Sequence, residues 1–401
     1  MAQTYFQKGF NLKAVVGPVL AQNYHSRVVE RLRELGHAAR AGDLTLRLAR
    51  EFGFCYGVDR AVEYAYETRE KFPDRRIFLS GEIIHNPDVN GRVERLGIRI
   101  LPEKGAPAER YAEVSAADVV ILPAFGVPVG EMEYLRAQGC VLVDTTCGSV
   151  LNVWKNVHMY AREGFTAVIH GKHYHEETKA TASQALTHPG GHYLCVRDRD
   201  EAKAVCEFIR GRMPAADIVA RFSRAASPGF DPERHLERVG LANQTTMLMS
   251  ESLEIQEMLR TAVTDRWGEA ALPRRFRAFD TICSATQDRQ DAVLKMLDAG
   301  GLDVMVVIGG YNSSNTQALA RICAERLPTY HINGPDRIEG STLRHRPVGA
   351  HDDVLAPDWL PAGPATVGLT AGASTPNNVV GEVVERILAL RGRTAADLSA
   401  V

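Results

Sequence analysis

The sequence predicts an α/β protein with mostly parallel sheets, made of three similar units. Short apolar runs alternate with stretches of helical spacing along most of the 401 residues. An Asp-Thr-x-Cys motif occurs twice, at 144–147 and 280–283, and each copy stands between an apolar run and a helical pattern. A third cysteine, Cys55, has the same setting. Continuous apolar runs of this length are typical of parallel strands that are buried on both faces.

The elements follow from the spacing of apolar residues. Residues 1–44 form a leading extension, in which Val28, Val29, Leu32 and Leu35 predict a helix that ends near Gly36. The apolar runs predict strands at 77–79, 119–122, 141–143, 167–169, 304–308 and 365–369. Helical spacing predicts helices at 56–72, 131–138, 202–210, 253–264 and 316–325. We expect α/β domains at 45–146, 147–282 and 283–390, each with one of the three cysteines, and a tail at 391–401.

The composition is that of an ordinary globular protein, with 45% hydrophobic and 24% charged residues. A net charge of −2 gives no electrostatic reason to expect nucleic acid or a membrane as partner. No apolar stretch of 18 residues and no signal-peptide pattern is present in the sequence. Seven cysteines, an odd number, argue against a disulfide framework. These features predict a cytoplasmic location, where thiols stay reduced.

Three of the cysteines, Cys55, Cys147 and Cys283, are expected at strand-to-helix turns. The start of a helix favours a thiolate over a thiol, so three such groups brought together would form a metal or cluster site with one open position. Their separations of 92 and 136 positions do not fit a closed zinc site, whereas a three-cysteine [4Fe–4S] cluster leaves one iron open to substrate. Unrelated cysteines at helix starts are the competing interpretation. The remaining thiols are expected to be buried as small hydrophobic groups: Cys140, Cys195, Cys206 and Cys323.

Each cysteine is followed by two polar loops at strand ends, where open α/β sheets bind ligands. The loops are 81–87 and 122–128, then 169–178 and 242–246, then 308–316 and 368–376. The small, donor-rich turns 312–315 and 371–375 suit phosphate, although such residues are also ordinary helix caps. Neither a P-loop motif nor a Rossmann glycine motif occurs, so the sequence gives no support for a nucleotide site.

The loop 169–178 carries histidines at 170, 173 and 175 and acids at 176 and 177. In an extended segment His173, His175 and Glu177 would share one side and could bind a metal. Substrate contact is the favoured interpretation, because this loop corresponds in position to the Asn-Ser-Ser-Asn loop, whose side chains do not bind transition metals. A solvated charged loop is the third possibility.

These motifs together resemble the 4-hydroxy-3-methylbut-2-enyl diphosphate reductase family. The resemblance runs in order from about residue 50 to about 380, and the leading extension is similar to the cyanobacterial and plastid branch. It rests on Phe54-Cys55-x-Gly57-Val58, His85-Asn86, Ala124-x-Gly126-Val127, Asp144-x-Thr146-Cys147, His175-x-Glu177, Gln244-Thr245-Thr246, Cys283-x-Ala285-Thr286-x-x-Arg289-Gln290, Ser313-Ser314-Asn315 and Thr370-Ala371-Gly372-Ala373-Ser374.

The resemblance implies a trefoil of three pseudo-threefold-related α/β domains around one [4Fe–4S] cluster per chain, held by Cys55, Cys147 and Cys283. It implies reductive removal of the hydroxyl of an allylic diphosphate to give isopentenyl and dimethylallyl diphosphates, the last step of the methylerythritol phosphate route to isoprenoids. Glu177 would supply protons, with Thr245 holding or relaying them. The residues that would bind the diphosphate are His85, His175, Ser313, Ser314, Asn315 and Ser374. The expected electron donor is a ferredoxin or a flavodoxin.

Three features depart from the family pattern or lack a role. Many members carry a diphosphate-binding histidine where Phe125 stands, and phenylalanine cannot donate a hydrogen bond. Glu176 lies beside Glu177, which is chosen by its His-x-Glu spacing. The segment 184–239 is long and has no predicted chemical role. Two other functions remain open, a cluster-dependent hydro-lyase and an iron or redox sensor that binds a small anion.

Overall fold

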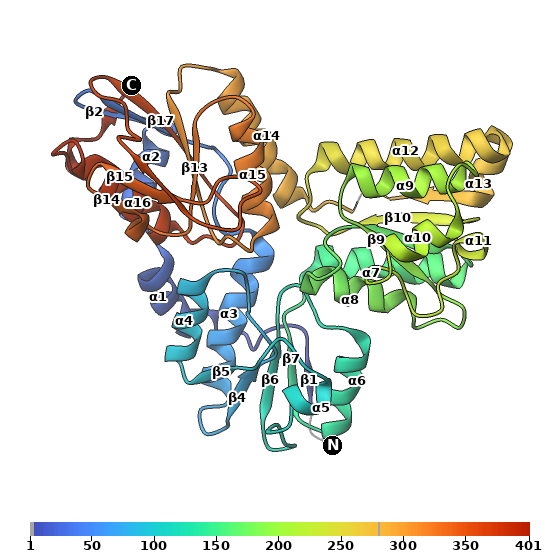
Figure 1. The fold of residues 1–401 in the computed structure, drawn as a ribbon. Helices are drawn as coiled ribbons and strands as arrows, with labels where there is room; N and C mark the ends of the chain where they lie inside the picture. The colour runs from blue at the N-terminus through green and yellow to red at the C-terminus, as the bar shows by residue number, and fades with distance from the viewer. Residues whose placement is uncertain (1–3, 280) are drawn as a thin grey trace. The chain divides into compact units, whose positions relative to one another are not determined.

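The computed structural model describes residues 4–279 and 281–401. The chain divides into two compact units, one built from residues up to 8, 72–81 and 97–283, and the other from 9–71, 82–96 and 284–401. Asp280, the first residue of the second Asp-Thr-x-Cys motif, lies outside the described residues. Figure 1 shows the ribbon of both units and labels most of the helices and strands.

The first unit contains two fully parallel sheets. One has the order β1-β7-β6-β4-β5, over Tyr5–Phe6, Val141–Asp144, Val119–Leu122, Ile77–Leu79 and Ile98–Ile100. The other has the order β11-β10-β8-β9, over Phe276–Ala278, Val239–Asn243, Thr166–His170 and Tyr193–Val196. Since neighbouring strands run the same way, the residues that follow them gather at one edge of each sheet.

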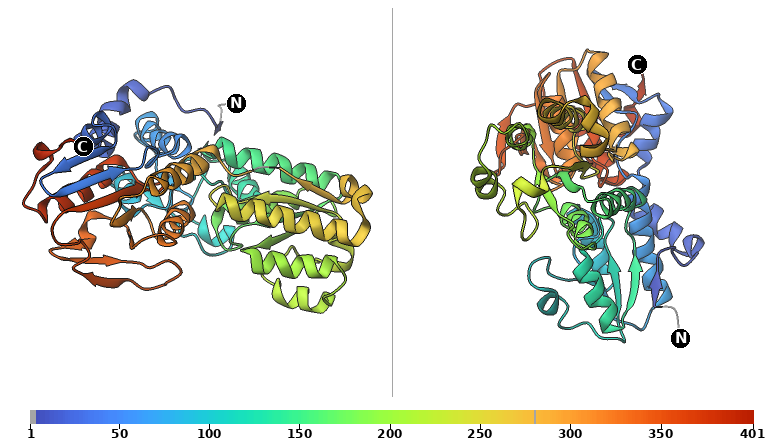
Figure 2. Two further views of the ribbon diagram at one scale, coloured as in Figure 1. Left: turned by 90° about the horizontal axis from the view of Figure 1, so that it is seen from above. Right: turned by 90° about the vertical axis from the view of Figure 1, so that its right-hand side faces the viewer.

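Helices cover both faces of the β11-β10-β8-β9 sheet. In Figures 1 and 2, α7 and α8 lie on one face of it and the neighbouring helices α9 and α12 on the other. The helices of this unit are α5 (Pro107–Arg110), α6 (Val129–Gln138), α7 (Gly148–Arg162), α8 (Glu176–Ala185), α9 (Arg199–Ile209), α10 (Ala215–Arg221), α11 (Pro232–His235), α12 (Met249–Trp267) and α13 (Leu272–Arg275). Gly240 of β10 allows α7 to approach closely, because a Cβ there would come within 2.6 Å of the Tyr160 ring.

The second unit is built on a mixed sheet with the order β13-β12-β17-β3-β2-β18. These strands run over Thr329–Ile332, Val304–Ile308, Ala365–Ala371, Leu44–Leu48, Ala38–Ala41 and Ser399–Ala400, and the last two pairings are antiparallel. A small antiparallel sheet adds β14 (Ile338–Glu339), β15 (Thr342–His345) and β16 (Val354–Pro357). The helices are α1 (Lys13–Tyr24), α2 (Arg27–Glu34), α3 (Tyr56–Lys71), α4 (Pro87–Arg95), α14 (Ser284–Asp298), α15 (Ser314–Ala324) and α16 (Asn377–Ala389).

Each of the three large sheets has its own hydrophobic core. All five residues of β12, Val-Met-Val-Val-Ile, are buried, as expected of a strand covered on both faces. In α7 the buried residues Val150, Val153, Val157 and Tyr160 recur every three or four positions and form the face that packs on the sheet. The cores therefore hold the strand ends, and the loops that follow them, in fixed places.

Most predicted elements are confirmed. All six predicted strands are present within the bounds of β4, β6, β7, β8, β12 and β17, and the five predicted helices correspond to α3, α6, α9, α12 and α15. The predicted leading helix is α2, and it ends just before Gly36, which has a φ of 75°. The segment 184–239 supplies β9 and helices α9 to α11 to the first unit. The strand that leads to Cys55, β3, pairs with β17, and the boundaries of the three domains remain a prediction.

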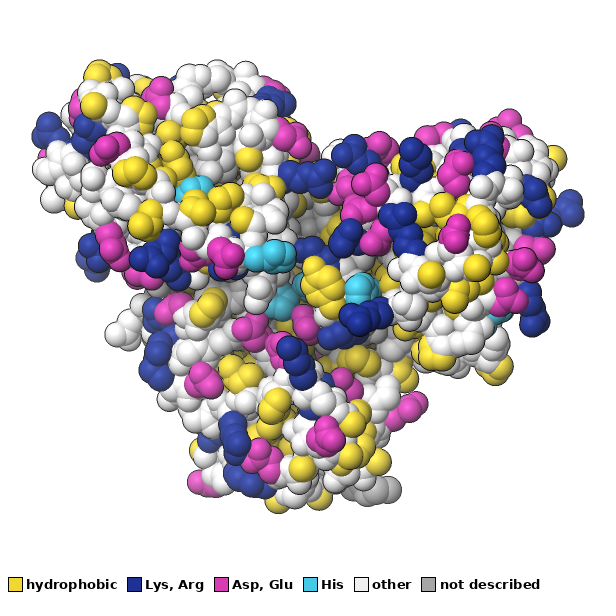
Figure 3. Space-filling model, in the orientation of Figure 1, with side chains coloured by type: hydrophobic (Ala, Val, Ile, Leu, Met, Phe, Trp, Pro, Cys, Tyr) yellow, Lys and Arg dark blue, Asp and Glu magenta, His cyan; other side chains and the backbone are white. Residues whose placement is uncertain are grey.

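Charged side chains of both signs are mixed on the face that Figure 3 draws. On the face drawn in Figure 3, acidic and basic side chains are interspersed, in keeping with the net charge of −2. Among the described residues, no helix combines the length and the apolar character that crossing a membrane requires.

Candidate active site

Three cysteines stand directly before helices, as the sequence predicts. Cys55 precedes α3, Cys147 is the N-cap of α7 and Cys283 precedes α14. All three cysteines are partly exposed. The other four cysteines are buried, which confirms the prediction for them, and burial raises their thiol pKa to about 11 at Cys140 and about 12 at Cys195, Cys206 and Cys323. Burial therefore keeps these four thiols protonated at neutral pH.

The three cysteine turns share one backbone contact. The N–H of Cys147 donates to the carbonyl of Ala124 over 2.8 Å, that of Cys283 to Thr245 over 3.2 Å, and that of Cys55 to Ala373 over 3.2 Å. Each acceptor lies in a predicted polar loop, 122–128, 242–246 or 368–376. The same bond thus recurs three times, always between a cysteine turn and the polar loop at the end of a neighbouring strand. This supports the predicted threefold repeat.

The loop 169–178 differs from one expectation. His173, His175 and Glu177 do not follow one another along an extended segment, because α8 begins at Glu176 and His175 is its N-cap. The Nδ1 atom of His175 accepts the backbone N–H of Glu177 over 3.2 Å. The ring of His175 takes the place of an ordinary capping residue. It accepts one of the N–H groups that have no partner within the first turn of α8. The alternation argument for a metal site in this loop is therefore wrong.

Glu177 is buried, with 3% of its surface exposed. Its Oε1 atom accepts the backbone N–H of Thr245 over 2.5 Å. Because the carbonyl of Thr245 also accepts the N–H of Cys283, the carboxyl group is two hydrogen bonds away from a cysteine turn. Glu176, its neighbour, is more exposed and lies 3.8 Å from the ammonium group of Lys179. The two adjacent acids therefore have different surroundings, and the carboxyl group of Glu177 is held by the backbone of Thr245.

Gln244 joins the segments around Glu177. Its side chain is fully buried, and its Oε1 atom accepts the N–H of Lys172 over 3.2 Å and the hydroxyl of Thr178 over 3.1 Å. Its Nε2 atom donates to the hydroxyl of Thr246 over 3.0 Å. One amide group thus fixes the loop before α8, the first turn of α8 and the Thr245 turn relative to one another. The Gln244-Thr245-Thr246 motif did not indicate this connecting role of Gln244.

Phe125 lies against His175. The two rings meet edge to face, with centroids 6.3 Å apart and an angle of 71°. Both residues are 8% exposed. The position where many family members carry histidine is therefore an apolar wall beside another histidine.

In the second unit, the loops with His85 and Ser374 are bonded to each other. The hydroxyl of Ser374 donates to the carbonyl of His85 over 3.3 Å, and the side-chain amide of Asn86 donates to the carbonyl of Ser374 over 2.8 Å. Gly310 lies so close to His85 that a Cβ would come within 2.3 Å of its carbonyl oxygen, so glycine is required there. Three predicted polar loops of this unit thus converge.

The Asn-Ser-Ser-Asn loop leads directly into α15. Ser313 is the N-cap, and its hydroxyl accepts the N–H of Thr316 over 3.3 Å. The Oδ1 atom of Asn315 accepts the N–H of Ala373 over 2.9 Å. Its Nδ2 atom is buried and has no hydrogen-bond partner among the residues that the structure describes. A buried amide donor of this kind is costly unless a ligand accepts from it. Ser314, the first residue of the helix, is also buried.

Arg289 of α14 supports the Cys55 turn, a role that the sequence did not reveal. The residue is 4% exposed, and its guanidinium group donates to the carbonyl of Gly53 over 2.7 and 3.1 Å and to that of Phe54 over 3.0 Å. The arginine of the Cys-x-Ala-Thr-x-x-Arg motif could have indicated this role, because a buried guanidinium group needs hydrogen-bond acceptors in fixed positions.

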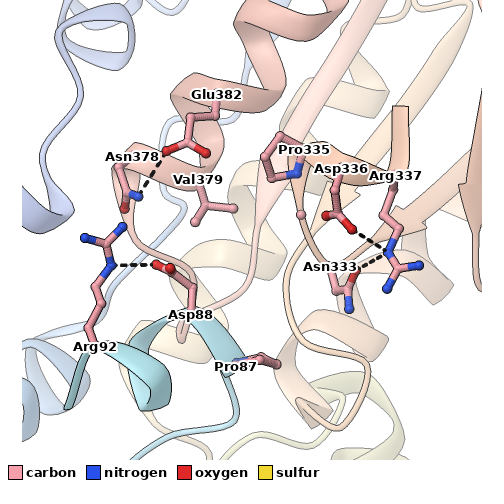
Figure 4. Close-up of a pocket in the computed structure, with 11 residues that line it drawn as sticks. Pro87, Asp88, Arg92, Asn333, Pro335, Asp336, Arg337, Asn378, Val379 and Glu382 are labelled. Carbon is pink, nitrogen blue, oxygen red and sulfur yellow. Dashed lines mark hydrogen bonds and ion pairs between the residues drawn. The ribbon is translucent and has the colours of Figure 1, made fainter. Parts of the chain in front are cut away.

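The second unit also holds a cavity of about 330 Å³, which Figure 4 shows. Its wall comes from α4, residues 333–337 and the first turns of α16. The charged groups there are paired, with Arg92 Nε 2.9 Å from Asp88 and Arg337 Nε 2.7 Å from Asn333 Oδ1. None of the predicted site residues is among the described residues that line it. The cavity is therefore a separate feature.

Each unit assembles part of the predicted set. The first unit brings together Cys283, Thr245, Glu177 and His175, and it ties Cys147 to the loop of Phe125. The second unit brings together Cys55, His85, Ser374 and Asn315 in the same way, with Ser313 and Ser314 at the start of α15.

Fold and site together define an α/β protein in which three cysteine-led helices are bonded to three polar strand-end loops. Such a protein is found among known families. The family model described as LytB protein matches residues 46–388, and the chain belongs to this family.

The chain is similar to proteins named 4-hydroxy-3-methylbut-2-enyl diphosphate reductase. The one from Gloeobacter violaceus is 47% identical, with 98% of this chain and 94% of the relative covered, and the one from Thermosynechococcus vestitus is 46% identical, with 97% and 96% covered. These sources agree with the predicted cyanobacterial branch.

Two solved structures are also similar. One is described as (E)-4-hydroxy-3-methyl-but-2-enyl diphosphate reductase, the terminal enzyme of the non-mevalonate pathway. It is 28% identical with a TM-score of 0.52, over 85% of this chain and 98% of that chain. The reductase from Plasmodium falciparum is 22% identical with a TM-score of 0.63, over 86% and 87% of the chains, and this likeness concerns the fold alone. The predicted α/β class is confirmed.

Proposed function

We propose that this protein reduces (E)-4-hydroxy-3-methylbut-2-enyl diphosphate to isopentenyl and dimethylallyl diphosphates. The C4–O bond of the allylic alcohol breaks, two electrons and two protons are consumed, and the oxygen leaves as water. Membership of the LytB family and 47% identity to a reductase of this name over nearly the whole chain support the reaction and the substrate.

One observation in the structure carries the proposal, the bonded series Glu177–Thr245–Cys283. A buried carboxyl group is held by the N–H of Thr245, whose carbonyl accepts the N–H of Cys283. The series thus connects a carboxyl group that can donate a proton to a cysteine that can hold an electron-carrying cluster. Reductive removal of a hydroxyl group needs a proton donor and an electron source, because the leaving oxygen must be protonated while electrons arrive.

The thiols fit a cluster with one open position. Cys55, Cys147 and Cys283 are the partly exposed members of the seven cysteines, and each stands directly before a helix. Thiolate ligands at such positions suit an iron–sulfur cluster. We propose that these three residues hold one [4Fe–4S] cluster, which when bound would supply the electrons and a Lewis-acidic iron.

Other residues bind the diphosphate and move protons. Glu177 delivers protons to the leaving oxygen, and Thr245 holds the carboxyl group in place. The donors for the diphosphate are His85, His175, Ser313, Ser314, Asn315 and Ser374. The buried Nδ2 atom of Asn315 supports this assignment. Neutral donors suffice in a desolvated pocket, because hydrogen bonds to an anion are stronger than neutral ones.

The test is an anaerobic assay of the cluster-reconstituted protein with the allylic diphosphate and a chemical one-electron donor. We expect both products only when the donor is present. Product without a donor would indicate a hydro-lyase, and an intact cluster without any product would favour the sensor. A ferredoxin or flavodoxin as the natural donor, and a cytoplasmic location, are parts of the same proposal; replacing the chemical donor by each purified protein tests the first.

A further inference from the structure

Phe125 is fixed in place by its own loop. The N–H of Gly126 donates to Pro123 over 2.9 Å, and Gly126 has a φ of 76°, so the chain turns sharply after Phe125. A Cβ at Gly126 would lie 2.5 Å from the indole ring of Trp154 in α7. The Nε1–H of that indole donates to the hydroxyl of Thr181 in α8 over 3.2 Å. The loop is therefore packed against α7, which is itself tied to α8.

The capping contact with α8 indicates the tautomer of His175. Its Nδ1 atom accepts the N–H of Glu177, and a ring nitrogen accepts only when it carries no proton. The neutral ring must then carry its proton on Nε2. If the ring turned over, a carbon would replace Nδ1 at the start of α8, and the N–H of Glu177 would lose this acceptor.

The edge-to-face contact with Phe125 opposes that rotation. The ring centroids are 6.3 Å apart, both residues are buried, and the loop of Phe125 packs on α7, which is tied to α8 by the bond from Trp154 to Thr181. An aromatic pair of this geometry is favourable beyond its burial, and a leucine side chain in the same place would not provide it.

We infer that Phe125 is a positioning residue for His175. It holds the imidazole with Nδ1 toward α8, so that Nε2–H is presented as a neutral donor to a diphosphate group. This inference rests on the proposed function, in which His175 binds the substrate diphosphate. It assigns a role to the position at which the chain departs from its family: an aromatic wall orients a neighbouring histidine in place of a second direct donor.

The first experiment measures the dissociation constant of inorganic pyrophosphate, by calorimetry on the cluster-loaded protein. Phe125→Leu is expected to weaken binding roughly two- to twelvefold, the range of one edge-to-face ring pair. Phe125→Tyr keeps the ring and should stay within about twofold of the wild type. Phe222→Leu is the matched control, since Phe222 is buried in the same unit in a different core region and should lose stability without changing affinity.

A double-mutant cycle with His175→Asn shows whether Phe125 acts through His175. Asparagine can still cap α8 but has no ring to orient. In that background Phe125→Leu should change the dissociation constant by less than about 1.5-fold, because the two effects are coupled. An equal loss of affinity in both backgrounds would overturn the inference, as would unchanged binding in Phe125→Leu itself.

The outcome for Phe125 can be separated from the outcome for the reaction. If the wild type reduces the allylic diphosphate but the cycle shows no coupling, only the role of Phe125 fails. If the wild type binds pyrophosphate and the cycle shows coupling, but no product forms with an electron donor, the proposed reaction fails and the positioning role stands. In turnover, Phe125→Leu should raise KM by the same factor as it weakens binding and leave kcat within about twofold.

Discussion

The N–H of Thr245 donates to the carboxyl group of Glu177 over 2.5 Å, and the carbonyl of the same residue accepts the N–H of Cys283 over 3.2 Å. One residue of the loop after β10 thus contacts both the start of α8 and the backbone of Cys283. Because these contacts use the backbone of Thr245, its hydroxyl group is available for a different contact. The backbone of Thr245 therefore helps to fix the position of the Glu177 carboxyl group.

Glu177→Gln should abolish turnover without disturbing the site. Glutamine has a carbonyl oxygen that can accept the N–H of Thr245, so the local geometry is kept, but it cannot deliver a proton. We expect kcat to fall roughly 100- to 10,000-fold, with cluster content and pyrophosphate affinity close to those of the wild type. The matched control is Glu176→Gln, which removes a half-buried acid beside Lys179 and should keep kcat within about threefold. Near-normal turnover in Glu177→Gln would move the acid role elsewhere.

Cluster retention tests the three cysteines. Cys147→Ser, Cys55→Ser and Cys283→Ser each replace a soft thiolate by a hydroxyl, which is a poor ligand for iron. Iron and sulfide content and visible absorbance after anaerobic reconstitution should fall to near background in each variant. Cys206→Ser is the control, because its thiol is buried in the core and its pKa is raised by burial to about 12. A full cluster in any of the first three would contradict the ligand assignment.

Arg289→Met should loosen the Cys55 turn. The substitution removes charge-assisted bonds to the carbonyls of Gly53 and Phe54 while keeping most of the apolar stem. Each such bond contributes about 1.5–3 kcal/mol, so the melting temperature should drop by several degrees and an iron chelator should remove the cluster faster. Arg326→Met, at an exposed ion pair with Asp298, should change neither value measurably. Equal chelation rates for Arg289→Met and the wild type would exclude a supporting role.

Acid should destabilise the first unit through His170. Burial lowers the pKa of this histidine to about 4, whereas the unfolded chain titrates near 6.5. Between these pH values the unfolded form binds more protons than the folded form. The contribution of neutral His170 to the free energy of unfolding is therefore complete above pH 6.5 and is lost as the pH falls toward 4. The melting temperature should fall over this range, and less steeply in His170→Gln. His331, whose pKa is also lowered to about 4, adds a similar slope in the second unit, so the variant's profile should not become flat. If the melting temperature falls equally steeply with pH in His170→Gln and in the wild type, His170 does not cause the loss of stability in acid.

Much of the fold could be predicted because strands such as β6, β8 and β12 are buried at every position. Continuous apolar runs such as 304–308 and helical repeats such as that of α12 carry their own signal. The start of α8 could not be predicted, because the capping group is the ring of His175, and histidine is not a usual cap. An alternating His-x-His-x-Glu pattern therefore suggested an extended segment where a helix begins.

The sequence predicted which residue types form the candidate site, but it did not predict the hydrogen bonds and ring contacts that join them. Three cysteines before helical patterns could be recognised from sequence, but the bonds from Cys147 to Ala124 and from Cys55 to Ala373 join positions far apart in the chain. The contact of Phe125 with His175 is of the same kind, since only the fold brings them together. Local patterns identify candidate ligands, whereas the residues that orient them depend on tertiary packing.

Asn315→Asp should weaken diphosphate binding sharply. Aspartate can still accept the N–H of Ala373, as Oδ1 of Asn315 does over 2.9 Å, but it replaces the buried Nδ2 donor by a negatively charged oxygen. Losing a hydrogen bond to an anion corresponds to roughly a 10- to 100-fold loss of affinity, and charge repulsion adds to it. Calorimetry with pyrophosphate measures the effect, and the melting temperature shows whether the loop is intact. Asn312→Asp is the matched control, since that side chain is exposed in the same loop and its change should leave affinity within about threefold. If both variants bind pyrophosphate as the wild type does, the amide of Asn315 does not contact the anion.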